Sequence, residues 1–203
     1  MNTSPISEEY EGPIATLRFC RPAERNPLSI ATLDTLNQAL TRIRSQPSIK
    51  VIILTGTDDV FLSGANIREL TTLDSQSAKA FSEKGQALTD AIATNHATTI
   101  AAVNGYCMGG GLDFALACDI RLASSTAVFA HPGARLGIIT GWGGTQRLPR
   151  IIGRTKAIEL FATARRLSAA EALKAGLVTQ VADPVLDAAK TLAQRIISTS
   201  SKT

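Results

Sequence analysis

The chain has 203 residues, 44% of them hydrophobic and 19% charged, which is the balance of a globular protein with one sizeable core. The net charge of +4 is spread without lysine or arginine runs and aromatic residues make up only 4%, so we expect no nucleic-acid partner. No apolar run reaches the roughly 18 residues of a membrane span and no signal peptide is visible, so we expect no membrane partner and a cytoplasmic protein.

The first half of the chain alternates short apolar segments with helical ones. Residues 1–12 are polar and are predicted to be a loose N-terminus, followed by a single domain over residues 13–203. We expect a strand at 14–20 and then, after a loop with two prolines, a helix that Ser29 caps. The apolar run IKVIILTG at 49–56 predicts a strand buried on both faces. Residues 74–95 are predicted to form an amphipathic helix.

The second half continues the alternation. A second buried strand is expected at 98–105, leading into three glycines and a short helix, and two more short strands are expected at 119–124 and 127–131. A glycine-rich loop at 137–148 precedes three predicted helices, at 154–164, 168–176 and 184–198, the second ended by Gly176. Strands that alternate with helices predict an α/β fold built on βαβ-type units.

Gly109, Gly110 and Gly111 stand where a strand is expected to enter a helix. The unpaired N–H groups and the dipole at a helix start favour negative charge, either a phosphate or an oxyanion that develops during a reaction. The spacing matches neither a dinucleotide fingerprint nor a P-loop, and no G-x-S-x-G is found in the chain. Tight packing of the helix on a neighbour is the alternative that the residues leave open.

Several stretches together carry a resemblance to a known family. In chain order they are RPAERNPLS, VIILTG, FLSGANIREL, AAVNGYCMGGGLDFALACDIRLAS, FAHPGARLGI, GGTQRLPRIIG and AAEALKAGLV. With them the chain resembles the crotonase superfamily, the enoyl-CoA hydratase/isomerase family. The resemblance implies an α/β fold of repeated β-β-α units with a short helical C-terminal part, and an acyl-CoA thioester as substrate with no permanent cofactor. Fatty acid metabolism is the family's usual setting.

The resemblance also implies residues for chemistry. Backbone N–H groups of Ala65 and Gly110 would hold the thioester oxygen. Asp113 falls where typical hydratases carry the first of two glutamates, and the second falls at Gly133, which has no side chain. Family members with an aspartate in the next loop have it where Gly141 stands. Asp113 is therefore the only obvious acid/base, although a carboxylate in a first helical turn also serves the helix dipole. Hydration benefits from two such groups, whereas isomerisation or decarboxylation needs fewer.

The other residues expected near the substrate belong to the loops. Arginines are candidates for the phosphates, small and polar residues for the backbone cradle, and aromatic residues for an acyl pocket, and each also has an ordinary structural role as a surface, capping or core residue. They are Arg21, Arg25, Arg68, Ser63, Gly64, Asn66, Ile67, Gly109, Phe129 and Trp142. The resemblance also implies a further C-terminal helical segment that builds a trimer in family members. We expect that segment to be truncated here and the protein to be a homo-oligomer, a trimer or a dimer of trimers.

Two other functions remain open at this stage. Clp-type peptidases share the architecture, and Cys107 with His131 would be a possible nucleophilic pair. A non-catalytic acyl-CoA-binding or assembly subunit is the second, because the second acid is missing at Gly133. No metal is expected, since His96 and His131 have no partners at ligand spacing, and the three cysteines predict no disulfide frame.

Overall fold

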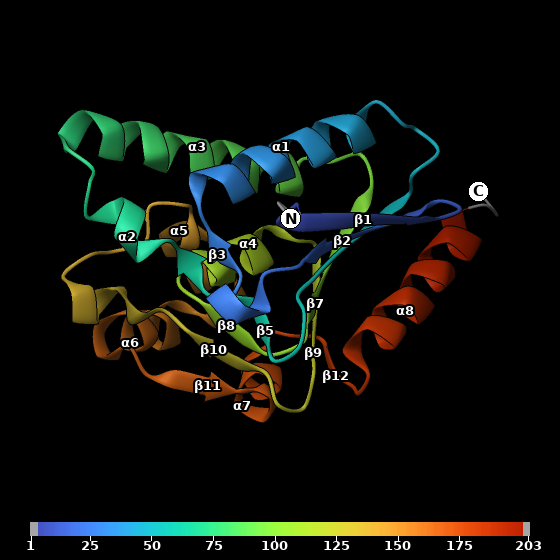
Figure 1. The fold of residues 1–203 in the computed structure, drawn as a ribbon. Helices are drawn as coiled ribbons and strands as arrows, with labels where there is room; N and C mark the ends of the chain where they lie inside the picture. The colour runs from blue at the N-terminus through green and yellow to red at the C-terminus, as the bar shows by residue number, and fades with distance from the viewer. Residues whose placement is uncertain (1–3, 201–203) are drawn as a thin grey trace.

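The computed structural model describes residues 4–200 and shows sheets with helices packed around them (Figure 1). The larger sheet has the strand order β1 (Ile6–Glu11), β2 (Ile14–Phe19), β4 (Val51–Thr55), β7 (Thr98–Val103), β9 (Ile120–Ala123) and β12 (Gln180–Val181). β1 runs antiparallel to β2, and all other neighbours in this sheet run parallel. Parallel neighbours require crossover connections, which helices supply.

A smaller sheet lies beside the first. Its strand order is β11 (Arg166–Ser168), β10 (Val128–Ala130), β8 (Tyr106–Met108) and β5 (Val60–Leu62), and a separate pair joins β3 (Pro27–Leu28) to β6 (Gly64–Ala65). Each central strand of the larger sheet is followed by a strand of the smaller sheet and then by a helix: β4, β5, α2; β7, β8, α4; and β9, β10, α5. The expected α/β fold of repeated β-β-α units is confirmed.

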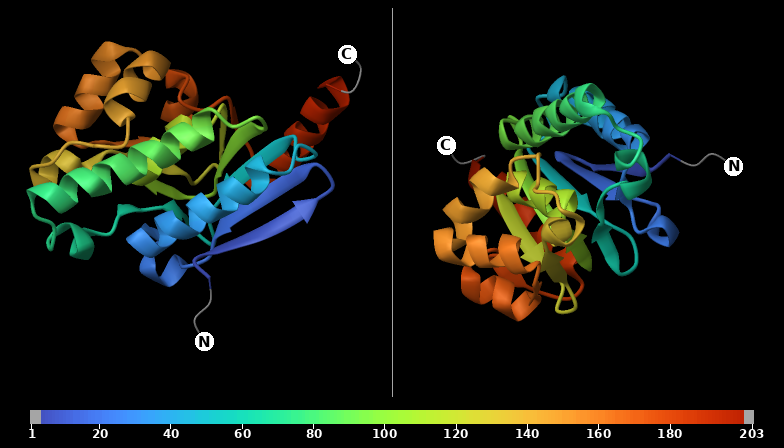
Figure 2. Two further views of the ribbon diagram at one scale, coloured as in Figure 1. Left: turned by 90° about the horizontal axis from the view of Figure 1, so that it is seen from above. Right: turned by 90° about the vertical axis from the view of Figure 1, so that its left-hand side faces the viewer.

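The helices are α1 (Ile30–Arg44), α2 (Ile67–Leu70), α3 (Ser75–Ala93), α4 (Gly110–Ala117), α5 (Gly144–Ile152), α6 (Arg154–Thr163), α7 (Ala169–Ala175) and α8 (Val185–Ser200). Their ends follow from local chemistry. The predicted cap of α1 is confirmed, because the Ser29 hydroxyl accepts a hydrogen bond from the N–H of Thr32 at 3.2 Å. Gly176 ends α7 in the left-handed conformation, φ 76°, as predicted. α5 to α7 and the β1–β2 hairpin lie at opposite sides of the molecule (Figure 2).

The core has two parts, one on each face of the larger sheet. Along β4, Ile52 and Leu54 point into the cluster that α1, α3 and α4 complete, whereas Val51 and Ile53 point into the cluster that α8 completes. Successive side chains of a strand point to opposite faces, so a continuous apolar run suits a strand that is covered twice. The prediction of a strand buried on both faces within 49–56 is confirmed.

The N-terminal segment corrects a prediction. Residues 6–11, expected to be loose, form β1, whose register runs from Ile6 opposite Phe19 to Glu11 opposite Ile14. Ile6 is buried, and Glu8 and Glu11 pair with Arg42 of α1 and Lys190 of α8. Backbone pairing with β2 and one buried anchor order a segment whose side chains are mostly polar. Residues 1–3 of the predicted loose stretch lie outside the described residues.

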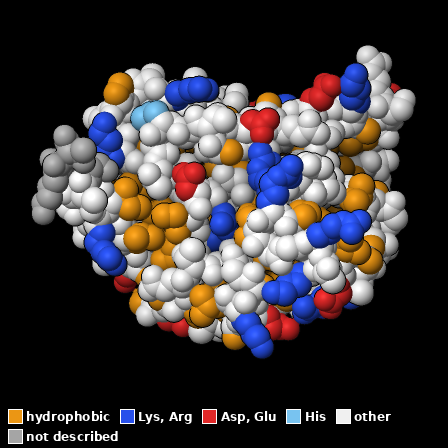
Figure 3. Space-filling model, turned by 180° about the vertical axis from the view of Figure 1, so that it is seen from behind, with side chains coloured by type: hydrophobic (Ala, Val, Ile, Leu, Met, Phe, Trp, Pro, Cys, Tyr) orange, Lys and Arg blue, Asp and Glu red, His pale blue; other side chains and the backbone are white. Residues whose placement is uncertain are grey.

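The surface carries charges of both signs. On the face opposite that of Figure 1, Lys and Arg side chains are spread among acidic, apolar and uncharged ones (Figure 3). Within residues 4–200, no helix has the length and apolar character needed to cross a membrane.

Candidate active site

Three parallel strand ends build one wall of the candidate site. β5, β8 and β10 run parallel, so their carboxyl ends lie at the same edge of the smaller sheet. The register pairs Met108 with Ala130, and the N–H of Gly109 donates to the carbonyl of Ala130 at 2.9 Å. Gly109 and His131, which directly follow these strands, therefore leave the sheet side by side.

A cavity of about 430 Å³ opens at this edge, between the loop after β5, the start of α4 and the loop that precedes α5. Most of the residues expected near the substrate line it: Ser63, Gly64, Ala65, Ile67, Gly109, Gly110, Asp113, Gly133, Gly141 and Trp142. The rest of the wall is largely apolar and includes Leu70, Leu73, Phe81, Leu136, Ile138 and Ile139. Such a wall suits an apolar group with a few polar contacts.

The three glycines at the start of α4 have different reasons to be glycine. Gly109 has a φ of +53° and open space around its Cα, so it is needed for the backbone turn. A Cβ on Gly110 would lie 2.4 Å from the ring of Trp142, and one on Gly111 would lie 2.4 Å from the carbonyl oxygen of Leu62. Tight packing, the alternative that the sequence left open, therefore holds at positions 110 and 111.

The loop after β5 meets the start of α4. Gly64 has a φ of +96°, and a Cβ there would lie 3.0 Å from the backbone nitrogen of Gly110. The backbone of Gly64 and Ala65 is thus against the first residue of α4, and both segments line the cavity. Gly110 belongs to the first helical turn, where N–H groups have no partner within the helix.

Asp113 is held on both of its carboxylate oxygens. It is 1% exposed; His131 Nε2 lies 2.9 Å from Oδ1, and the hydroxyl of Thr140 donates to Oδ2. His131 is itself 3% exposed. Among the described residues that line the cavity, Asp113 and His131 are the only two with a titratable acid or base. The sequence interpretation took Asp113 as the only obvious acid/base and considered His131 only as a partner of Cys107. It did not place His131 against Asp113, a contact that follows from the parallel register of β8 and β10.

Cys107 is not part of this pair. Its thiol is fully buried within β8 and does not line the cavity. Burial, and after it the charge of Asp113, hold the pKa of the Cys107 thiol well above its usual range. The nucleophilic pair of Cys107 with His131 is therefore wrong, because the imidazole is bonded to Asp113 and the thiol stays protonated.

Gly133 has a structural reason to lack a side chain. A Cβ there would lie 2.5 Å from the carbonyl oxygen of Ile138. Any acid at position 133 would require the 138–140 loop to move. Gly141 is less restricted, since a Cβ there would meet only the hydroxyl of Ser82 closely, at 2.7 Å.

Trp142 lines the cavity with a largely buried ring. Its ring centroid lies 5.2 Å from that of Phe81 on α3 and 5.7 Å from that of Phe114 on α4, and its Nε1 donates to the carbonyl of Phe81 at 3.4 Å. The ring is buried among these partners, so its position fixes the depth of the cavity at that point.

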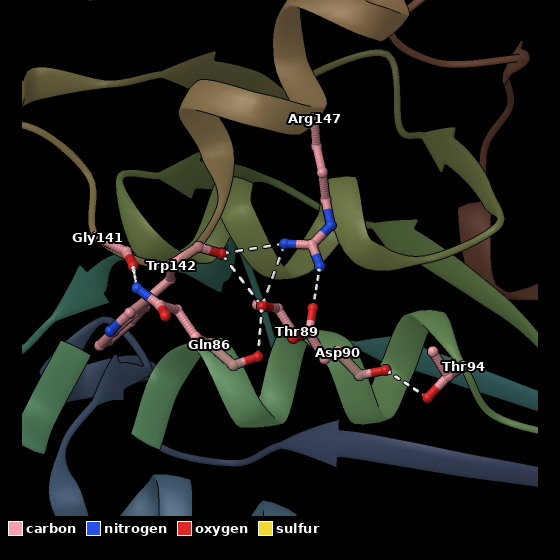
Figure 4. A network of polar contacts seen from close by, with 7 residues as sticks. All are labelled: Gln86, Thr89, Asp90, Thr94, Gly141, Trp142 and Arg147. Atoms are coloured by element: carbon pink, nitrogen blue, oxygen red, sulfur yellow. Dashed lines mark hydrogen bonds and ion pairs between the residues drawn. The ribbon is translucent and has the colours of Figure 1, made fainter. Parts of the chain in front are cut away.

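A polar network fixes the backbone that carries this ring (Figure 4). Arg147 of α5 points at α3, where Nη2 lies 2.7 Å from Oδ1 of Asp90, and its Nη1 donates to the carbonyl of Trp142 at 3.2 Å. The side-chain amide of Gln86 donates to the carbonyl of Gly141 at 2.7 Å. Helix α3 holds the carbonyl of Gly141 through Gln86, and that of Trp142 through the hydroxyl of Thr89, which donates to it at 3.2 Å.

Some expected residues lie elsewhere. Arg21 is 4.0 Å from Glu24, and the Arg25 guanidinium lies 4.9 Å from the ring centroid of Tyr106. Asn66 caps α2, accepting from the N–H of Arg68 at 3.1 Å. Phe129 is fully buried in the core. None of these residues lines the cavity. Within residues 4–200 no group of three His, Cys, Asp or Glu side chains could hold a metal ion.

A family model, curated relatives and solved structures all match this chain to the same family. A family model described as enoyl-CoA hydratase/isomerase matches residues 9–203. The chain is 39% identical over 193 residues to a crotonyl-CoA hydratase of Syntrophomonas wolfei, covering 94% of this chain and 74% of that protein. It is 36% identical to a short-chain-enoyl-CoA hydratase of Clostridium acetobutylicum, with coverages of 98% and 77%. The crystal structure of an enoyl-CoA hydratase from Bacillus anthracis superposes with a TM-score of 0.92 at 35% identity, over 96% of this chain and 77% of that one.

Proposed function

Because the chain belongs to the enoyl-CoA hydratase/isomerase family, we propose that it binds an acyl-CoA thioester in this cavity and converts it through an enolate, with hydration of a short enoyl-CoA as the reaction. The observation that carries the proposal is the meeting of the Gly64–Ala65 backbone with the start of α4, beside a buried carboxylate. That combination offers hydrogen-bond donors for a carbonyl oxygen and a group for its proton.

The thioester oxygen accepts hydrogen bonds from the backbone N–H groups of Ala65 and Gly110. Negative charge grows on this oxygen when the enolate forms, and the positive end of the α4 dipole lies at the same place. Donors that are already positioned for the oxyanion need no reorganisation, and one such donor typically contributes about 3–4 kcal/mol to transition-state stabilisation. The close approach of Gly64 to Gly110 supports this assignment.

Asp113 exchanges a proton with the substrate. It lies in the first turn of α4, three residues beyond Gly110, and lines the same cavity. Its other contacts, with His131 and Thr140, fix the carboxylate in one orientation. A positioned acid or base of this kind typically contributes a factor of about 10²–10⁴ to the rate.

The test is the hydration of crotonyl-CoA, followed as the loss of absorbance of the conjugated thioester. We expect Asp113→Asn to lower kcat by about 100-fold or more, with little change in KM. Asp34→Asn is the matched control, because Asp34 is exposed on α1 and pairs only with Lys84 in the described structure. Equal activity of Asp113→Asn and the wild type would remove Asp113 from the mechanism.

A wild-type protein that binds crotonyl-CoA and does not hydrate it would favour one of two alternatives. Isomerisation or decarboxylation needs fewer proton-transfer groups than hydration, and an acyl-CoA-binding or assembly subunit needs none. The absent side chain at Gly133 is the observation that favours these alternatives. Turnover of a β,γ-enoyl-CoA would separate the first from the second.

The proposal includes a homo-oligomer, a trimer or a dimer of trimers. Ile138, Ile139 and Ile158 are 49%, 68% and 50% exposed and line an apolar groove next to the cavity. Exposed apolar side chains that gather in this way favour association. Size-exclusion chromatography with light scattering tests this, and a single monomer peak would contradict it.

A further inference from the structure

We propose that His131 and Asp113 work as one proton-transfer pair, and that this pair supplies the second acid–base function that Gly133 cannot. The inference rests on the proposed hydration in the same cavity. It concerns how a site with one carboxylate can both activate water and protonate carbon.

The geometry places the two groups in direct contact inside the cavity wall. The imidazole Nε2 and the carboxylate Oδ1 are 2.9 Å apart, both side chains are almost fully buried, and both line the cavity. Thr140 donates to the other carboxylate oxygen and so fixes its orientation. A carboxylate has about four lone-pair sites, so these two hydrogen bonds leave acceptor capacity for a water molecule or substrate.

Within residues 4–200, no third charged side chain is shown in an ion pair or hydrogen bond with either member of the pair. On β8 the thiol of Cys107 is fully buried, and burial holds its pKa well above the usual range. On α6 the ring of Phe161 lies 5.0 Å from the imidazole, between centroids. Among the described cavity-lining residues there is no Lys, Arg or Glu. A proton that enters this pair therefore has Asp113 and His131 to reside on, and it can pass between them across the 2.9 Å contact.

A pair that holds one proton at the start can complete hydration without a further group. The oxygen of water forms a bond to the β-carbon, and the π electrons of the double bond move to give the enolate. Water loses one proton to the pair, and the pair gives one proton to the α-carbon, whose carbon–hydrogen bond takes the enolate electrons. The pair ends with the one proton that it began with, so only water is consumed.

The experiment compares His131→Gln with His96→Gln in the full chain. Glutamine can still donate a hydrogen bond to Asp113, but it cannot carry the proton. His96 is the other histidine of the chain; its Nε2 contacts the carbonyl of Ile49, and it does not line the cavity. Thermal unfolding of each variant shows that it is folded, and crotonyl-CoA hydration is then measured between about pH 5 and 9, across the range in which histidine usually titrates.

We expect His131→Gln to lower kcat by about 100-fold or more with KM within about threefold, and to change the pH dependence of kcat. His96→Gln should keep both the rate and the profile. A His131→Gln variant with wild-type rate and profile would show that the imidazole only positions Asp113 and would overturn the proposal.

Hydrogen exchange at the α-carbon of butyryl-CoA in heavy water separates this failure from failure of the proposed function. Exchange requires enolate formation and one base at the α-carbon, and it does not require a proton to be taken from water that adds to the β-carbon. Wild-type exchange without hydration, unaffected by His131→Gln, would overturn the pair and leave enolate chemistry in place. Absence of both activities would overturn both proposals.

Discussion

We expect the substitution Gly85→Ala to destabilise this protein, although alanine is the better helix former. Gly85 lies in the interior of α3, where alanine is worth about 1 kcal/mol more than glycine. A Cβ at this position, however, would lie 2.1 Å from Nε1 of Trp142 and within 2.3 Å of two further atoms of the indole ring. The ring cannot retreat easily, because Phe81, Phe114 and Gly110 surround it.

The size of the effect follows from two opposing terms. Overpacking of a filled core typically costs about 1–3 kcal/mol, and overlap with three ring atoms belongs at the upper end. After the gain in helix propensity, about 2 kcal/mol of destabilisation remains for Gly85→Ala. When Trp142 is first replaced by leucine, the overlap is gone and Gly85→Ala should stabilise by about 1 kcal/mol. The coupling between the two positions is then about 3 kcal/mol.

Urea unfolding of the four proteins of this cycle measures the coupling. Trp142 is the only tryptophan of the chain, so circular dichroism has to replace fluorescence as the probe. The decisive result is the sign of the effect of Gly85→Ala in the two backgrounds. If Gly85→Ala stabilises both the wild type and the Trp142→Leu variant, or destabilises both equally, then contact with the Trp142 ring is not the reason for a glycine at position 85.

Other expectations concern surface and buried groups. Only Cys20 should react quickly with a thiol reagent in the folded protein at neutral pH, since burial raises the pKa of both other thiols; three fast thiols would contradict their burial. Arg147→Met should cost about 1–2 kcal/mol in urea unfolding and raise KM, because the carbonyl of Trp142 loses a donor, and unchanged values would make the network dispensable. Tyr10 is 43% exposed, and its partial burial, then the hydrogen bond to Glu8, raise the pKa of the phenol to about 12. Because the folded state holds this proton longer, stability should fall as the pH rises from about 10 to 12. Absorbance titration of the wild type and Tyr10→Phe detects a phenol that ionises near pH 12, and its absence from the wild type would contradict the raised pKa of Tyr10.

Local patterns predicted the central elements because those elements depend on local chemistry. The apolar run around Ile52 predicted a strand covered on both faces, and Ser29 and Gly176 marked helix ends through their own backbone and side-chain preferences. β1 was missed for the opposite reason. Its side chains are mostly polar, and its order comes from pairing with β2 and from the burial of Ile6. Neither contact can be predicted from the polar residues of the segment itself.

The site was predicted in part. The ordered motifs placed Ala65, Gly110 and Asp113 in what the structure shows to be one cavity. They did not place His131 against Asp113, because that contact depends on the register of two strands that are distant in sequence. The close approach of Gly85 to the ring of Trp142 could not be predicted either. A glycine within a helical pattern indicates only a weak helix former unless the residue that packs against it is known.

The short side chain of Asp113 and the imidazole of His131 are explained by the same packing. The resemblance to hydratases places a glutamate at position 113, and this chain has the shorter aspartate. In the structure the Oδ1 atom already lies against His131, Thr140 holds Oδ2, and Gly144 is without a side chain beside them: a Cβ there would lie 2.0 Å from Oδ1. An extra methylene at position 113 would push the carboxylate into these partners. His131 occupies space that a glutamate at position 113 would need, so the shorter aspartate on α4 and the imidazole after β10 together give the site two proton-transfer groups.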